Sequence, residues 1–206
     1  AQAHKWLYTL APAFGLIPAV TTIAVVPWGR SFVIPEMQLF GRTLFEGGRL
    51  FNPIVADVGA GILVIFALAS LGVYGITIAG WASANKYSLL GGMRAAAQLV
   101  SYELPMVLSV ASVALAAGTL SIIGIAEAWS PWWLLWQAPG AFVFLVAALA
   151  ELQRPPFDMP VADSEIVFGP YTEYSGLRFA FFLLAEYAGI VVMSLLPGTI
   201  GVYSVG

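Results

Sequence analysis

The chain has no cysteine, a single histidine and few charged residues, and each shortage excludes a class of function. Without cysteine it forms no disulfide, ligates no iron–sulfur cluster and performs no thiol chemistry. The one histidine, His4, lies near the start, so we expect no haem or zinc site held by this chain alone. Its 8 Lys and Arg against 11 Asp and Glu give a net charge of −3. No basic face is therefore available to neutralise nucleic-acid phosphates.

Charge of either sign is scarce, and this defines the class of protein. Charged residues make up 9% of the chain and hydrophobic residues 60%. A soluble domain carries about 25% charged residues, so this chain could not cover its surface with polar groups. The composition predicts an integral membrane protein. The sequence begins at Ala1 without an n-region and a cleavage site, so we expect no signal peptide and a piece of a longer chain.

Runs of about twenty residues with almost no charge predict an all-α membrane helix bundle that forms one domain, 1–206. Each run is long enough to cross about 30 Å of hydrocarbon. No internal repeat is visible among them. Five spans are predicted, at about 6–27, 58–81, 99–122, 131–150 and 179–202.

Basic residues in the loops set the expected orientation. One side has five of them and the other has three, Arg30, Arg42 and Arg49. The richer side predicts that loops 82–98 and 151–178 face the cytoplasm. We therefore expect an integral protein of a bacterial or archaeal inner membrane. The five residues on the richer side are Lys5, Lys86, Arg94, Arg154 and Arg178.

Acidic residues gather in one stretch, 151–186, between two apolar runs. Ionisable groups at a membrane boundary are costly, and the default interpretation of such a cluster is functional. Six of the eleven acids lie in this stretch: Glu151, Asp158, Asp163, Glu165, Glu173 and Glu186.

Three carboxylates are predicted inside or at the ends of spans, at one common depth. Glu103 would lie about five residues, or roughly 7 Å, inside the third span. Glu151 ends the fourth span, and Glu186 lies about two turns into the fifth. We expect Glu103 and Glu186 to lack partners within the spans. Carboxylates that are close together in an apolar setting share protons as a coupled set, so they predict a proton path or a charge sensor. The alternative for each acid is a solvated loop position, or an ion pair with Arg154 or Arg178.

The segment RPPFDMP predicts a break in the backbone after the fourth span. Consecutive prolines forbid a helix, so the helix should stop by about Gln153. Phe157 and Asp158 would then lie on irregular backbone, which at membrane depth is tolerated only inside protein or beside a cavity. An amphipathic ligand such as a quinone suits such a cavity. The alternative is an interfacial loop packed under a soluble partner.

Two long motifs resemble the signature regions of the H-type membrane subunit of respiratory complex I, which lies at the heel of NADH:quinone oxidoreductase. They are GWASANKYSLLGGMRAAAQLVSYE at 80–103 and AELQRPPFDMPVADSEIVFGPYTEYSGLRFAFFLLAEYAGI at 150–190. The family has eight membrane helices, and this chain resembles helices two to six.

The resemblance implies a subunit of a proton-translocating enzyme that carries no redox centre or metal itself. Quinone would be the substrate at the interface with soluble iron–sulfur subunits on the cytoplasmic side. Antiporter-like and small membrane subunits, together with lipid, would be the other partners. The implied quinone-binding residues are Arg154, Phe157 and Asp158. The implied coupling residues are Glu103, Glu151, Asp158, Asp163, Glu165, Glu173 and Glu186.

The chain departs from the family pattern at two places. Val161 replaces the first glutamate of a PEAExE pattern, and Pro170-Tyr171 follows the retained Gly169 in place of a Gly-aromatic-polar turn. The run GPYTEYSG has features of membrane-bound hydrogenase relatives, whereas LLAEYAGI resembles the quinone-reducing branch. The alternatives are thus the equivalent subunit of an energy-converting hydrogenase or ferredoxin-linked complex, and a secondary cation transporter. The absence of repeats disfavours the transporter.

Overall fold

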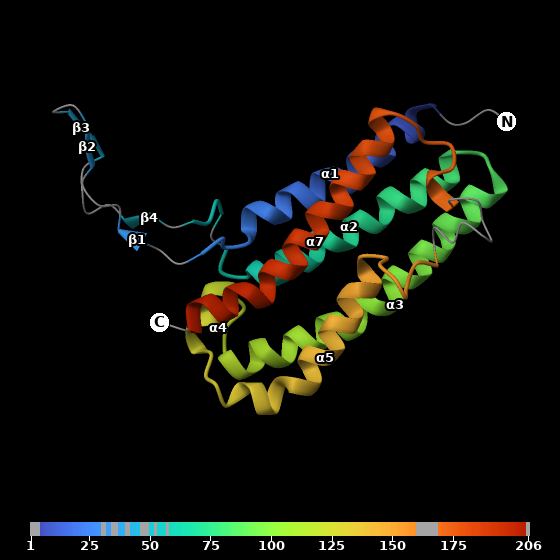
Figure 1. Cartoon of the computed structure of the whole chain (residues 1–206). Coiled ribbons are helices and arrows are strands. Elements are labelled where there is room, and N and C mark those ends of the chain that lie inside the picture. The colour runs from blue at the N-terminus through green and yellow to red at the C-terminus, as the bar shows by residue number, and fades with distance from the viewer. Residues whose placement is uncertain are drawn as a thin grey trace.

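The computed structural model describes residues 5–29, 32–33, 37–39, 42–45, 50–51, 53–56, 58–159 and 169–204. Within them the chain is a bundle of long helices, as the composition predicts (Figure 1). The helices are α1 Lys5–Val25, α2 Gly61–Ala82, α3 Lys86–Ala117, α4 Ile122–Ala128, α5 Trp133–Glu151 and α7 Leu177–Ser204, with a 3-10 turn η1 at Gly169–Tyr171.

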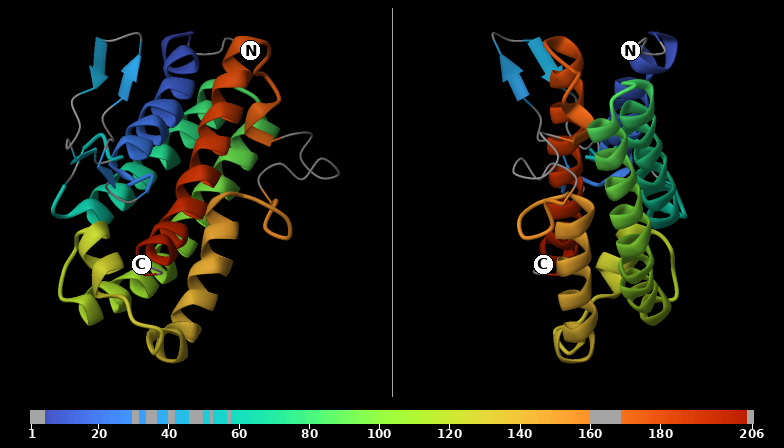
Figure 2. Two further views of the ribbon diagram at one scale, coloured as in Figure 1. Left: turned by 60° about the vertical axis from the view of Figure 1, so that its left-hand side comes forward. Right: turned by 90° about the vertical axis from the view of Figure 1, so that its right-hand side faces the viewer.

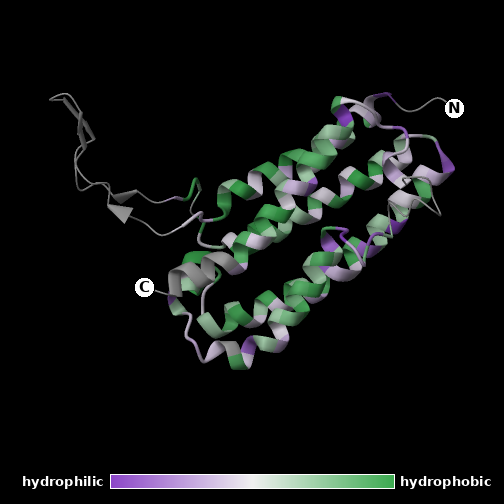
Figure 3. Cartoon of the chain, viewed as in Figure 1, coloured by the Kyte–Doolittle hydropathy of each residue, from purple (hydrophilic) through white to green (hydrophobic). Residues whose placement is uncertain are grey.

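Four of these helices are long and apolar enough to cross a membrane, namely α1, α2, α3 and α7 up to Pro197. A shorter apolar segment, Leu135–Glu151, forms most of α5. Hydrophobic residues predominate along the helices, whereas hydrophilic residues gather near the start of α1, at the α2–α3 turn and in the segment after α5 (Figure 3). The chain is therefore an integral membrane protein of the polytopic helical class.

The loop after α1 contains short strands that lie outside the helix bundle (Figures 1 and 2). They form two antiparallel two-stranded sheets, in which β1 pairs with β4 and β2 with β3. The strands are β1 Phe32–Val33, β2 Met37–Leu39, β3 Arg42–Phe45 and β4 Leu50–Phe51.

The predicted start of the third helix was wrong. We expected a loop over 82–98, but α3 begins at Lys86 and runs for 32 residues. Asn85 explains the early start, because its side chain caps the helix by accepting a hydrogen bond from the Tyr87 backbone N–H at 3.0 Å. Glu103 consequently lies 17 residues into α3, roughly 26 Å from its first residue at a rise of about 1.5 Å per residue.

Small residues allow the helices to approach closely. A Cβ atom added to Gly75 of α2 would lie 2.8 Å from the Gly15 backbone N of α1. One added to Gly91 of α3 would lie 2.7 Å from the Gly169 Cα of η1. Close backbone contact through glycine is the usual packing mode of membrane helices. These contacts bring η1, in the middle of the acidic stretch, against α3 and join α1 to α2.

Candidate functional site

The predicted break after α5 is confirmed. The helix ends at Glu151, Leu152 caps it, and Gln153 adopts a positive φ of 52°. The Pro155–Pro156 peptide bond that follows is cis. The Arg154 carbonyl then accepts a hydrogen bond from the Phe157 backbone N–H at 2.8 Å. The segment therefore turns back on itself immediately after the helix.

Side chains of α3 hold the far end of this turn. The Gln98 side-chain amide donates to the Ala150 carbonyl at 2.8 Å and to the Phe157 carbonyl at 2.7 Å. The Tyr102 ring meets the Phe157 ring edge-on, with 5.2 Å between centroids. Gln98 was not among the site residues predicted from the sequence. The only signal was an uncharged polar residue four positions before Tyr102, and therefore on the same helix face.

Arg154 forms an ion pair with α7. Its Nη2 lies 3.1 Å from Glu186 Oε1, and its guanidinium lies 5.4 Å from the centroid of the Tyr187 ring. Glu186 therefore has a partner outside the predicted spans, the ion pair with Arg154 that the sequence left open as an alternative. The turn after α5 carries Arg154 back to α7. Arg154 thus pairs with a helix residue of the acidic stretch.

Glu103 also has a partner, contrary to expectation. The Ser70 hydroxyl on α2 lies within hydrogen-bond distance of two acceptors. These are Glu103 Oε1 and, at 2.9 Å, the Phe66 carbonyl oxygen. Ser70 carries no sequence signal for this role, because a serine in a membrane helix commonly bonds its own i−4 carbonyl. Glu103 and Glu151 are close enough to interact electrostatically. The two carboxylates therefore form one group between α2, α3 and α5.

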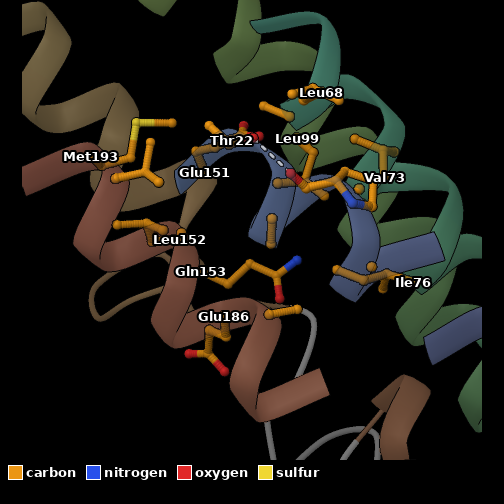
Figure 4. A pocket seen from close by; sticks show the side chains of 18 of the residues that line it. Thr22, Leu68, Val73, Ile76, Leu99, Glu151, Leu152, Gln153, Glu186 and Met193 are labelled. Atoms are coloured by element: carbon orange, nitrogen blue, oxygen red, sulfur yellow. Dashed lines mark hydrogen bonds between the residues drawn. The ribbon is translucent and has the colours of Figure 1, made fainter. Parts of the chain in front are cut away.

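A cavity connects this group to α7 (Figure 4). It measures about 150 Å³, and both Glu151 and Glu186 line it. Gln153 also lines it, between the two acids in the chain. In Figure 4 the Glu186 carboxylate is directed away from the Glu151 side chain. The cavity is therefore lined by one acid from each side of the break.

Two polar atoms at this cavity are buried and have no hydrogen-bond partner within the part of the chain that the structure describes. They are Glu151 Oε2 and Gln153 Nε2. A buried polar group without a partner is costly, and water is the usual solution where a site has room. At about 30 Å³ per molecule, the cavity has room for several waters.

The remaining acids of the stretch occupy three different settings. Asp158 is exposed and lies close enough to Glu186 and Tyr171 to interact with both. Glu173 accepts a hydrogen bond from the Asn85 side chain at 2.9 Å, at the α2–α3 turn. Asp163 and Glu165 lie outside the described residues, as does Val161.

Aromatic residues fix the segment between the turn and α7. The Tyr8 and Tyr174 rings stack with 4.2 Å between centroids, and the Tyr174 hydroxyl donates to the Tyr8 carbonyl at 3.1 Å. Arg178 lies 5.1 Å from the centroid of the Tyr8 ring. Burial, helped by the Glu186 and Asp158 carboxylates, raises the pKa of the Tyr171 hydroxyl above its usual range. Tyr171 therefore remains neutral near these acids.

A family model described as NADH dehydrogenase matches residues 1–200. An H-type NADH-quinone oxidoreductase subunit of Geobacter metallireducens is 45% identical over 97% of this chain and 57% of its own length. The H-type subunit of Geobacillus kaustophilus is 43% identical over 94% and 52%, respectively. Subunit 8 of the same kind of enzyme from Rhodothermus marinus is 42% identical over 97% and 54%. The chain thus spans about half the length of these relatives.

Proposed function

Because the chain belongs to the NADH dehydrogenase family, we propose that it is a membrane subunit of a proton-translocating NADH:quinone oxidoreductase. In this role it forms part of the quinone-binding chamber and couples quinone reduction to proton movement. It assembles with antiporter-like and small membrane subunits, and with soluble iron–sulfur subunits on the cytoplasmic face. The redox cofactors belong to those soluble subunits, and this chain supplies protein surface and carboxylates.

The observation that carries the coupling proposal is the path from α3 to α7. Glu103 is bonded to Ser70 and interacts with Glu151, and the cavity extends from Glu151 to Glu186. Water in this cavity would satisfy Glu151 Oε2 and Gln153 Nε2 and would give protons a hydrogen-bonded route. Arg154 connects the route to the turn by its ion pair with Glu186.

The turn itself is the proposed quinone contact. Phe157 offers an aromatic face, and Asp158 and Arg154 supply charges of opposite sign beside it. A quinone has an apolar body and two carbonyl oxygens, so it needs this mixture of apolar contact and a few polar groups. A change in quinone charge near Arg154 and Asp158 would alter the field at Glu186, because these three groups interact.

The test of coupling replaces Glu103 with glutamine in the intact complex. We expect Glu103→Gln to lower proton pumping in membrane vesicles by about tenfold or more, because an amide does not exchange the proton that a carboxyl group carries. Pumping would be measured by quenching of a pH-sensitive dye during NADH oxidation, and assembly by the amount of purified complex. Glu127→Gln is the matched control, because Glu127 lies on α4, outside the path. Full pumping by an assembled Glu103→Gln complex would refute the coupling role.

The test of the quinone contact replaces Phe157 with alanine. Loss of an aromatic contact worth about 1 kcal/mol would raise the apparent KM for a short-chain quinone about fivefold. Phe142→Ala is the matched control, since Phe142 is an exposed residue of α5 far from the turn. An unchanged KM in Phe157→Ala would remove the turn from the quinone chamber.

A further inference from the structure

The two contacts that α3 makes with Phe157 converge from one helix face. Gln98 and Tyr102 are four residues apart in α3, so their side chains project in the same direction. Gln98 reaches the Phe157 backbone, whereas Tyr102 reaches its ring. Phe157 is thus held at both its main chain and its side chain by a single rigid element.

The orientation of the Gln98 amide is fixed by its surroundings. Its side chain is 3% exposed, and its Nε2 donates to two carbonyl oxygens. A primary amide has two donor hydrogens, so both are used here. Rotation of the amide by half a turn would place its oxygen against these two carbonyl oxygens and lose both bonds. Gln98 therefore joins the last turn of α5, at Ala150, to Phe157 in the middle of the proline segment.

The position of Arg154 depends on the same anchor. The Phe157 N–H donates to the Arg154 carbonyl, and the Arg154 N–H donates to the Leu149 carbonyl at 3.1 Å. Arg154 therefore lies between two backbone points that Gln98 holds at a constant separation, Ala150 and Phe157. From there its guanidinium reaches Glu186 on α7. A displacement of the turn on α3 would move this ion pair as well.

We propose that Gln98 and Tyr102 are positioning residues of the quinone chamber, which set the place of Phe157 and Arg154 without touching the quinone. This inference rests on the proposed function, because it concerns how the turn is held for its ligand. It adds a role for α3, whose side chains influence the site through their contacts with the backbone and ring of Phe157.

The experiment measures quinone kinetics of the intact complex carrying Gln98→Met. Methionine has a similar length and removes both donors. We expect the apparent KM for a short-chain quinone to rise about fivefold, while kcat per assembled complex stays within about twofold. Gln137→Met is the matched control: this glutamine lies near the other end of α5, where its Oε1 accepts a hydrogen bond from the Ser112 hydroxyl at 3.1 Å.

A double-mutant cycle tests Tyr102 independently. Tyr102→Leu should raise the KM, whereas Tyr102→Phe keeps the ring and should leave it unchanged. If Tyr102 acts through Phe157, Tyr102→Leu/Phe157→Ala should have the KM of Phe157→Ala alone. Multiplied effects of the two substitutions would overturn the proposal for Tyr102. If Gln98→Met prevents assembly, this cycle still tests the positioning role.

The outcomes separate this inference from the function on which it rests. A higher KM in Phe157→Ala together with an unchanged KM in Gln98→Met and Tyr102→Leu would overturn the positioning role and leave the quinone chamber standing. An unchanged KM in Phe157→Ala would refute the chamber and the positioning role together. A loss of assembled complex in Gln98→Met and Tyr102→Leu, with normal KM in what remains, would show a structural role only and would also overturn the proposal.

Discussion

At the scale of single residues, the Arg154–Glu186 ion pair links the turn after α5 to α7. Its side chains are 35% and 30% exposed, so solvent screens the pair and its contribution to stability is modest, about 1 kcal/mol or less. We expect Arg154→Gln to impair quinone-coupled pumping, and Arg154→Lys to impair it less. Lysine keeps the charge but lacks the planar fork that lies over Tyr187.

Removing both charges should be less harmful than removing one. In Arg154→Gln, Glu186 loses the arginine that stabilises its carboxylate at the cavity, whereas Arg154→Gln/Glu186→Gln removes both members of the pair. The amount of assembled complex, determined by quantitative blotting of membranes, should therefore be higher in the double variant than in Arg154→Gln. Arg178→Gln is the control arginine, since Arg178 lies over Tyr8. Equal assembly in the double variant and Arg154→Gln would contradict this account of the pair.

Tyr171 gives a prediction about pH. Its pKa in the folded protein lies above the usual value of about 10, so above that pH the unfolded chain binds fewer protons than the folded one. Stability should therefore fall as the pH rises beyond about 10. Tyr171→Phe keeps the ring contacts with Phe179 and Phe182 and should reduce this fall.

The measurement for Tyr171 is thermal inactivation of the complex between pH 9 and 11. Tyr74→Phe is the control, because Tyr74 is an exposed residue of α2. The same alkaline loss of stability in Tyr171→Phe and in the unmodified protein would show that the Tyr171 hydroxyl does not contribute to it.

At the scale of helices, two glycines of α2 offer a matched comparison. A Cβ on Gly75 would lie 2.8 Å from the Gly15 N and 3.2 Å from the Ala11 carbonyl oxygen of α1, whereas one on Gly72 would meet nothing within 4 Å. We expect Gly75→Ala to force α1 and α2 apart at a cost of about 1–3 kcal/mol. Gly72→Ala should be neutral or slightly stabilising, because alanine favours a helix.

The temperature at which half of the complex loses activity measures this difference in isolated membranes. Gly75→Ala should lower it and Gly72→Ala should not. Equal temperatures for Gly75→Ala and the unmodified complex would mean that the α1–α2 crossing accommodates a methyl group, in contradiction to the observed backbone contact.

That the chain forms long helices was predictable from its composition, but the residues at which α3 begins and ends were not. Gly91, Gly92 and Pro105 are all signals that weaken or end a helix in water, yet α3 runs through all three. The glycines serve close approach, since Gly92 packs on Gly80 and Gly91 on η1. This tertiary use of glycine has no local signature, so hydropathy alone placed the start of the helix too late.

The acidic residues of the candidate site were predictable from the sequence, whereas their contacts were not. The apolar spans led to Glu103, Glu151 and Glu186, and the proline segment correctly predicted the end of α5. The partners of these acids lie on other elements: Ser70 on α2 bonds Glu103, and Arg154 pairs with Glu186 across the turn. Such pairings depend on how helices cross, which the chain order does not reveal.

At the scale of the whole molecule, the helix directions agree with one membrane orientation. The start of α1, the α2–α3 turn and the start of α7 lie at one end of the bundle, and α4 and the end of α7 lie at the other (Figure 1). Lys5, Lys86 and Arg178 lie at the first end, so the positive-inside rule predicts that this end faces the cytoplasm. The start of α7, which follows the proposed quinone turn in the chain, then lies on the side where we propose that soluble partners bind.

The absence of cysteine makes this orientation directly testable. Ser175 is an exposed residue between η1 and α7, and Ser130 lies in the connection from α4 to α5 at the other end. In the complex, Ser175→Cys should react with a membrane-impermeant maleimide only in inverted vesicles, and Ser130→Cys only in right-side-out ones. Labelling after detergent solubilisation is the control for access in each variant. Labelling of Ser175→Cys from the outside would reverse the orientation and place the proposed quinone turn on the wrong side for its partners.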